Sequence, residues 1–134
     1  MIEIEAMFPV MVASDLVAVK AFYETVFGFN AVFFDPEFYL HLVSSSTGVQ
    51  LGFLLPGHES QPLFLHPVMS TDGYVISLEV KDALKAYTEA KTMNLTVSMP
   101  LKEEDWGQIH FILQDPAGFH IDVVQHLNAP DTGE

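Results

Sequence analysis

The alternation of apolar and polar positions predicts the same order of elements in both halves of the chain. Residues 7–13 form an apolar, β-compatible run that ends at Ser14 and Asp15, both good helix N-cap residues. Apolar residues recur at helical spacing over 16–27, and Gly28 suits the position just after a helix. Three further strand-like runs follow, at 29–34, 38–43 and 49–55. The first half is therefore predicted to form a β-α-β-β-β module.

The second half repeats this order after an irregular stretch at 56–71, whose prolines and lack of period are typical of a linker. The junction Val80-Lys81-Asp82 stands 67 positions after Ala13-Ser14-Asp15. The predicted elements are a strand at 74–80, a helix at 83–93, a strand at 95–99, an acidic loop at 100–105 and strands at 109–113 and 119–124.

This internal repeat predicts the α+β class. The order of elements lacks the strict strand–helix alternation of a doubly wound parallel sheet. We expect one domain over 1–134, built from two β-α-β-β-β modules at about 7–55 and 72–127. Their curved, mixed sheets would carry the helices on the outside.

The segment 106–125 is predicted to be a hairpin. Its turn, Asp115-Pro116-Ala117-Gly118, has Pro and Gly where tight turns prefer them. Strand alternation then puts His120, Asp122 and Val124 on one face. A carboxylate is costly to bury without a partner. The strand that contains Asp122 therefore borders a polar cavity or faces water.

The composition limits the partners that the chain can bind. Its 18 acidic and 5 basic residues give a formal net charge of −13, which argues against nucleic acid and anionic membranes. The same charge favours a cationic ligand, although it also serves plain solubility. With 134 residues, 49% of them hydrophobic, the chain can bury a core without disulfides, and it has no cysteine. No apolar run approaches the roughly 18 residues of a membrane span and no basic signal peptide is present, so we expect a cytoplasmic protein.

Several motifs occur together in the two modules. The first module contains V-A-S-D-L followed by A-F-Y-E-T-V-F-G-F, and the second contains V-K-D-A-L-K-A-Y and W-G-Q-I-H-F-I-L-Q-D-P-A-G-F-H-I-D-V-V-Q. In combination they resemble the vicinal oxygen chelate superfamily, which includes glyoxalase I, extradiol dioxygenases and bleomycin-resistance proteins. The resemblance implies paired β-α-β-β-β modules, a cup-shaped sheet and a homodimer. In character the chain is nearest to the metal-free, bleomycin-resistance-like branch.

The resemblance also implies positions for a divalent metal, which enzymes of the superfamily hold with His and Glu on inner strands. Here Phe8 and Val75 stand at the two positions of the module-opening His, and Asp122 stands at the last-strand position. The fourth position falls near 50–52, where there is no His, Glu or Asp. Phe and Val cannot coordinate a cation, and one carboxylate alone does not hold a metal tightly against water. We therefore expect no metal and no other cofactor.

The ligand-binding candidates combine the inward positions of the module-opening strands, aromatic residues at the rim and the polar face of the hairpin. They are Phe8, Val10, Phe38, Tyr39, Val75, Glu79, Trp106, His110, His120 and Asp122. Trp106, flanked by acidic residues, either stacks on a planar or cationic ligand or caps the core. The remaining histidines share no ligand spacing and are predicted to be surface or core residues; they are His41, His58, His66 and His126.

His110 and Asp122 are the candidate catalytic residues. A hairpin register that pairs Ile112 with His120 would place His110 opposite Asp122, close enough for a charge-assisted hydrogen bond. A slip by one residue would separate them. Three interpretations stay open: a general acid/base couple in which Asp122 orients the imidazole, an unusual metal site that includes His120, or a buried polar pair without chemistry.

Two functions are consistent with these features. The first is a metal-free binding protein that sequesters a hydrophobic, partly cationic small molecule in an acidic, aromatic-lined groove. The second is an enzyme of the same superfamily, an isomerase, lyase or dioxygenase, with a displaced metal site or with His110 as a base. Because both module-opening histidines are absent, the sequence favours binding.

Overall fold

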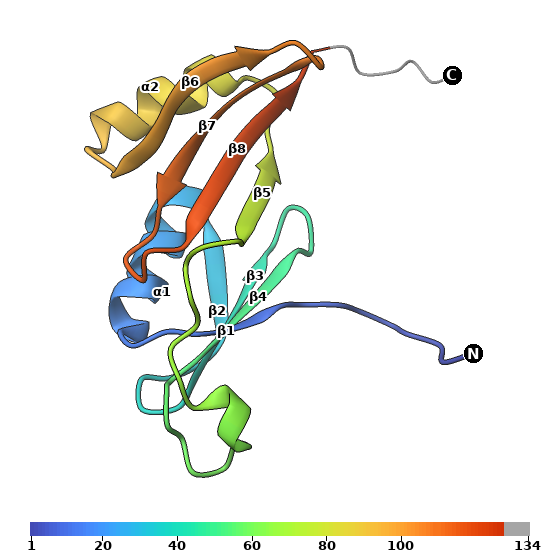
Figure 1. Cartoon of the computed structure of the whole chain (residues 1–134), viewed down its shortest axis with the longest axis vertical. Coiled ribbons are helices and arrows are strands. Elements are labelled where there is room, and N and C mark those ends of the chain that lie inside the picture. Colours follow the sequence, from blue (N-terminus) through green and yellow to red (C-terminus); the bar gives the residue numbers. More distant parts are fainter. Residues whose placement is uncertain (128–134) are drawn as a thin grey trace. The chain divides into compact units, whose positions relative to one another are not determined.

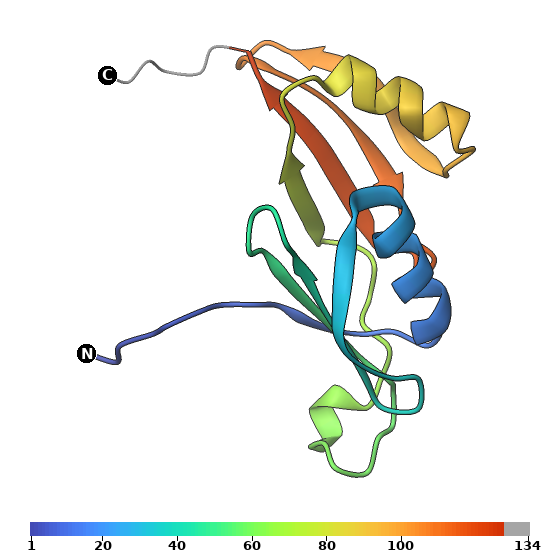
Figure 2. The same ribbon diagram turned by 180° about the vertical axis from the view of Figure 1, so that it is seen from behind.

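Each half of the chain contains a four-stranded sheet and one long helix (Figures 1 and 2). The computed structural model describes residues 1–127 and divides the chain into two units, Met1–Ser70 and Thr71–Glu134, called unit 1 and unit 2 below. Both units have the element order β-α-β-β-β, which confirms the predicted α+β class with two such modules. No helix within residues 1–127 is long and apolar enough to cross a membrane.

Unit 1 is a mixed sheet in the order β1-β4-β3-β2. Strands β1 and β4 are parallel, and the other neighbours are antiparallel. Its elements are β1 (Val10–Val12), α1 (Leu16–Phe27), β2 (Phe29–Asp35), β3 (Tyr39–Ser44), β4 (Gln50–Leu54) and the short 3₁₀ helix η1 (Leu63–Leu65). The predicted first strand, 7–13, is therefore shortened. Pro9 lacks an amide hydrogen, and the ladder with β4 begins at Val10.

Unit 2 repeats this topology in the order β5-β8-β7-β6, again with one parallel pair, β5 and β8. Its elements are β5 (Val75–Glu79), α2 (Ala83–Thr92), β6 (Val97–Glu104), β7 (Gln108–Gln114) and β8 (His120–His126). The predicted acidic loop at 100–105 is wrong, because β6 continues to Glu104. An edge strand tolerates Pro100 and charged side chains, and β6 also has register shifts on either side of Met99.

Both helices begin where the sequence predicts; α1 also ends there, whereas α2 ends at Thr92, one residue before the predicted end. The carboxylate of Asp15 accepts a hydrogen bond from the amide of Ala18, and Asp82 caps α2 in the same way. Gly28 ends α1 with a φ of 70°, a conformation that glycine adopts without steric cost. The capping residues therefore fix both strand-to-helix junctions that reveal the repeat in the sequence.

Each helix packs on one face of its own sheet. In unit 1 the ring of Tyr23 is fully buried and lies 5.5 Å from the ring of Phe53. In unit 2 the ring of Tyr87 lies 5.1 Å from that of Phe111. Because side chains alternate along a strand, the neighbours of Phe111 point to the opposite side of the sheet. This opposite side, the helix-free face of unit 2, contains His110, Ile112 and Asp122.

Candidate functional site

The β7–β8 hairpin determines which side chains meet on the helix-free face of unit 2. Asp115 Oδ1 accepts the amides of Ala117 and Phe119, each at 2.9 Å, and Gly118 has a φ of +88°. These contacts close a three-residue loop at 116–118, which continues into ladder pairs of Gln114 with His120 and Ile112 with Asp122. The predicted pairing of Ile112 with His120 is therefore wrong by two residues.

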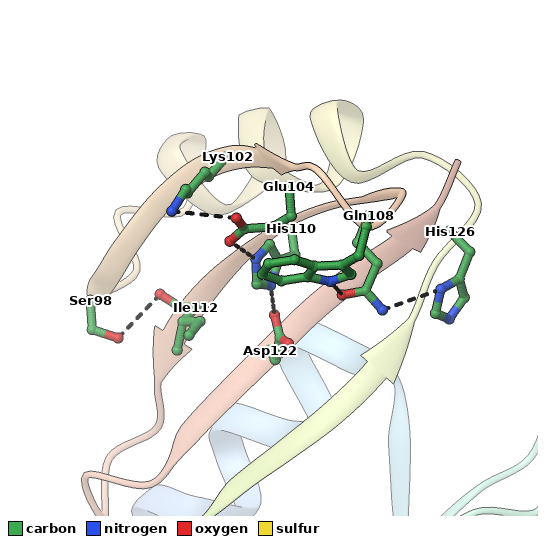
Figure 3. Close-up of polar contacts among 9 residues, drawn as sticks. Ser98, Lys102, Glu104, Gln108, His110, Ile112, Asp122 and His126 are labelled. Carbon is green, nitrogen blue, oxygen red and sulfur yellow. Dashed lines mark hydrogen bonds and ion pairs between the residues drawn. The ribbon is translucent and has the colours of Figure 1, made fainter. Parts of the chain in front are cut away.

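The predicted contact between His110 and Asp122 is nevertheless confirmed. A shift of two residues leaves every side chain on its face, since the period of a strand is two. His110 pairs with Val124 in the ladder, and its Nδ1 reaches Asp122 Oδ1 diagonally at 2.7 Å (Figure 3). The opposite ring nitrogen, Nε2, lies 2.9 Å from Glu104 Oε2. The imidazole thus lies between two carboxylates.

Glu104 belongs to this cluster, although the sequence placed it in a loop. It comes from the end of β6, where it pairs with Gln108 across a three-residue turn, 105–107, that ends in Gly107 with a φ of 91°. This turn resembles the one at 116–118, which also ends in a glycine with positive φ. That shared turn pattern is the signal in the sequence that could have extended the strand to Glu104.

The geometry suits a protonated His110. An ionised carboxylate only accepts hydrogen bonds, so contacts at both ring nitrogens need a hydrogen on each of them. Burial by itself lowers the pKa of His110, which is 8% exposed, but hydrogen bonds to Glu104 and Asp122 and their negative charges outweigh burial and raise this pKa. The hydrogen bond from His110 in turn lowers the pKa of Glu104. In the protonated ring neither nitrogen has a free lone pair, which argues against His110 as a general base.

A cavity of about 330 Å³, widely open to solvent, lies on the same face of unit 2. Ile112 lines it and is the ladder partner of Asp122, while Val75 lines it and is the ladder partner of His120. The cavity therefore borders the His110 cluster. Its lining combines apolar and polar side chains: Thr71, Asp72, Gly73, Tyr74, Val75, Ser98, Met99, Ile112 and His120. Of these, the sequence had singled out only Val75 and His120.

Trp106 does not cap the core, because it is 68% exposed. Its indole N–H donates to Gln108 Oε1 at 2.8 Å, and the amide nitrogen of Gln108 lies 3.4 Å from His126 Nδ1. His126 Nε2 lies 3.0 Å from Glu79 Oε2. This chain of contacts fixes the orientation of the indole at the turn between β6 and β7. It connects Trp106 and Glu79, two of the predicted ligand-binding residues.

The other candidates belong to unit 1, where Phe8 and Tyr39 both contact His41. The ring of Phe8 meets His41 edge-on with 4.6 Å between centroids, and the Tyr39 hydroxyl lies 2.7 Å from His41 Nδ1. His41 Nε2 lies 2.6 Å from Gln50 Oε1. Phe38 lies 6.0 Å from the ring of Tyr39. Burial raises the pKa of Tyr39, so its hydroxyl stays protonated at neutral pH.

The two units have different residues at one set of corresponding strand positions. In unit 1 Val10, 39% exposed, pairs with Gly52, and in unit 2 Ser77 pairs with Asp122. Gly52 therefore stands where unit 2 has Asp122. An added Cβ at Gly52 would overlap the hydroxyl of Tyr39, so the glycine leaves room for that side chain. Unit 1 thus has a tyrosine over a glycine where unit 2 has a histidine beside an aspartate.

The residues at the metal positions implied by the family resemblance do not fit a divalent metal. Phe8 and Val75 have no donor atom. Near the fourth position, Gln50 Oε1 already contacts His41. Asp122 Oδ1 already accepts from His110, whose ring nitrogens are both engaged. Within residues 1–127 no group of three or more His, Cys, Asp or Glu side chains is arranged to hold a metal ion.

His120 does not join the His110 cluster. Its Nδ1 lies 3.2 Å from the carbonyl oxygen of Thr71, and its Nε2 lies 3.5 Å from the side-chain nitrogen of Gln114. The contact with Thr71 attaches the segment before β5 to strand β8. His120 therefore belongs to the wall of the cavity, and the structure does not bring it together with His110 and Asp122 as a ligand set.

Comparison with known proteins supports the resemblance seen in the motifs. The sequence profile of the Glyoxalase/Bleomycin resistance protein/Dioxygenase superfamily matches residues 7–123. A lactoylglutathione lyase from Agrobacterium tumefaciens has a similar structure, with a TM-score of 0.75 and 19% identity, over 94% of this chain and 96% of that chain. No curated protein matches the sequence.

Two further solved structures have the same fold. A member of the glyoxalase/bleomycin resistance protein/dioxygenase superfamily from Sphaerobacter thermophilus has a TM-score of 0.72 and 24% identity, over 92% of this chain and 98% of that chain. A family enzyme from Burkholderia phytofirmans has a TM-score of 0.73 and 21% identity, over 90% of this chain and 97% of that chain. At these identities the similarity shows the fold alone.

Proposed function

This chain belongs to the glyoxalase/bleomycin resistance protein/dioxygenase superfamily, and we propose that it is a metal-independent small-molecule binding protein. The observation that carries the proposal is the cavity of about 330 Å³ next to a histidine whose two ring nitrogens both contact carboxylates. Small-molecule sites range over roughly 300–1,000 Å³, so the cavity suits a small ligand or part of a larger one. The adjacent His110 offers no free base for chemistry.

The ligand that suits this face has an apolar body and a cationic or hydrogen-bond-donating group. Val75, Met99 and Ile112 supply apolar surface to the cavity. Asp122 is the ladder partner of Ile112, which lines the cavity; its Oδ1 contacts His110, while no contact within residues 1–127 engages Oδ2. A charge-assisted hydrogen bond to that oxygen would anchor an ammonium or amidinium group. The formal net charge of −13 adds a long-range attraction for cations.

An enzyme of the same superfamily is the alternative, since one structural neighbour is a lactoylglutathione lyase by name. Catalysis with His110 as the base would require one ring nitrogen without a hydrogen, and both nitrogens contact carboxylates. Catalysis with a displaced metal would require the ion to copurify or to rebind. Elemental analysis of the purified protein therefore separates the two functions, and stoichiometric Fe, Mn, Ni or Zn would contradict the binding proposal.

Three probes with one aromatic body and different charge test the ligand class: 2-naphthylmethylamine, 2-naphthylmethanol and 2-naphthoic acid. We expect the amine to raise the melting temperature most, the alcohol less and the acid least, because ligands of the native state stabilise it. Calorimetric titration would then give the dissociation constants. Binding of the acid as tightly as the amine would contradict the proposed ligand class, and binding of none of the three would contradict the proposed site.

Two variants locate the binding site. Asp122→Asn should weaken the binding of the amine by about 10- to 100-fold and change the affinity for the alcohol little. A hydrogen bond to a charged group contributes about 1.5–3 kcal/mol. Val75→Trp should weaken all three probes, because the indole would fill the cavity. Asp105→Asn is the matched control: it removes an exposed acid of the same unit, outside the cavity, and should leave all three affinities unchanged.

A further inference from the structure

The geometry points to a second role for His110: we propose that its imidazolium is a built-in counter-cation that replaces a divalent metal beside Asp122. The family resemblance implies a metal at the Asp122 position, and the donor atoms around it do not fit one. The charge that a metal would supply to this carboxylate comes from a protonated side chain instead. This role is separate from ligand binding, because the imidazolium would stabilise the ionised side chains of Glu104 and Asp122 on this face.

The formal charges of His110 and the ionised side chains around it sum to zero. His110 Nδ1 lies 2.7 Å from Asp122 Oδ1, and Nε2 lies 2.9 Å from Glu104 Oε2 (Figure 3). Lys102 Nζ lies 3.4 Å from Glu104 Oε1. The imidazolium and the lysine give +2, and the two carboxylates give −2. Without His110, two carboxylates whose side chains are only 11% and 17% exposed would share one exposed lysine.

The remaining titratable groups of this face do not supply that charge. On β5, Glu79 contacts His126, which lies at the end of β8. On β8, His120 contacts the carbonyl oxygen of Thr71 and the side chain of Gln114. The neighbours of His110 within β7 are Gln108 and Ile112 on this face, and neither is charged. His110 is therefore the one side chain within residues 1–127 that bridges the acids of β6 and β8.

A bound metal and this imidazolium exclude each other. A metal at Asp122 would need further donor atoms, and the neighbouring His110 would offer it only a positively charged ring whose two nitrogens already contact carboxylates. The internal repeat supports the same conclusion. At the equivalent positions unit 1 has Tyr39 and Gly52, so the acid is absent there. Unit 2 has the acid together with its own counter-charge.

Three measurements test the proposal. Nitrogen-15 NMR of the ring should show hydrogens on both nitrogens of His110 at pH 7. Treatment with EDTA, or addition of 1 mM MnCl₂ or ZnCl₂ at matched ionic strength, should leave the melting temperature of the native protein unchanged within about 1 °C. His110→Ala should melt lower, and Mn²⁺ or Zn²⁺ should raise its melting temperature by about 3 °C or more, because the uncompensated carboxylates can then bind a dication.

Control variants make these outcomes specific. The gain of metal response should vanish in the double variant His110→Ala, Asp122→Asn, and it should not appear in His126→Ala, which loses only exposed contacts with Glu79 and Gln108. Should His110→Ala fail to fold, the NMR and metal measurements on the native protein still test whether His110 is protonated and whether a metal binds. A neutral His110 ring at pH 7, or one Mn²⁺ or Zn²⁺ per native chain lost in Asp122→Asn, would overturn the proposal. Failure of the naphthyl probes would overturn only the proposed function.

Discussion

At the scale of single residues, His110 links the stability of unit 2 to pH. The folded state raises the pKa of His110 above its ordinary value of 6.5. The contribution of His110 to the free energy of unfolding is therefore fully present below about pH 6.5 and is lost as the pH rises through the folded-state pKa. The folded state lowers the pKa of Glu104 below its ordinary value of 4.5. Its contribution is therefore present above about pH 4.5 and is lost as the pH falls through its folded-state pKa.

We therefore predict that Glu104→Gln lowers the melting temperature most between about pH 5 and pH 6.5. In this window the carboxylate of Glu104 and the imidazolium of His110 are both charged in the native protein. The difference between native protein and variant should shrink toward pH 4 and toward pH 9. Melting curves by circular dichroism over this pH range provide the measurement. Glu79→Gln, which removes an exposed partner of His126, serves as the control, and a difference independent of pH would contradict the linkage.

At the scale of elements, the three-residue turn at 116–118 fixes the register that brings His110 near Asp122. Asp115 is 5% exposed, and its Oδ1 accepts the amides of Ala117 and Phe119. We predict that Asp115→Ala lowers the free energy of unfolding by about 1–3 kcal/mol, because buried amide donors would lose their acceptor. Asp115→Asn keeps an acceptor oxygen and should cost less. Urea unfolding followed by circular dichroism measures both, and equal losses would show that the acceptor is not responsible.

The sequence was sufficient to predict the elements that depend on local signals. Asp15 and Gly28 mark the ends of α1, and strand alternation together with the family resemblance put His110 and Asp122 on one face. The register and the extent of β6 depend on pairing with β7, a contact between segments that no local pattern specifies. For that reason Glu104 was missed. The cavity was missed because its wall combines residues before β5 with residues of β6, β7 and β8.

At the scale of the whole molecule, the dominant property is the excess of acid. Residues 1–70 contain seven acids and one lysine, a formal charge of −6, and residues 71–134 contain eleven acids and four lysines, a charge of −7. Both units are therefore strongly negative. Repulsion between like charges destabilises a compact chain, and under the proposed function the same field would attract a cationic ligand to the helix-free face of unit 2. Salt screens both effects, since the Debye length shortens from about 30 Å at 0.01 M to about 3 Å at 1 M ionic strength.

These two effects predict opposite responses to salt. Raising NaCl from about 20 mM to 500 mM should raise the melting temperature of the free protein, because screening weakens the repulsion among its carboxylates. The same change should weaken the binding of 2-naphthylmethylamine several-fold and change the binding of the neutral 2-naphthylmethanol little. Only the amine is attracted by the negative charges of the protein. Melting curves and calorimetric titrations at matched pH measure the two responses. If the amine and the alcohol responded equally to salt, the acidic field would have no part in ligand selection, and the net charge would serve solubility alone.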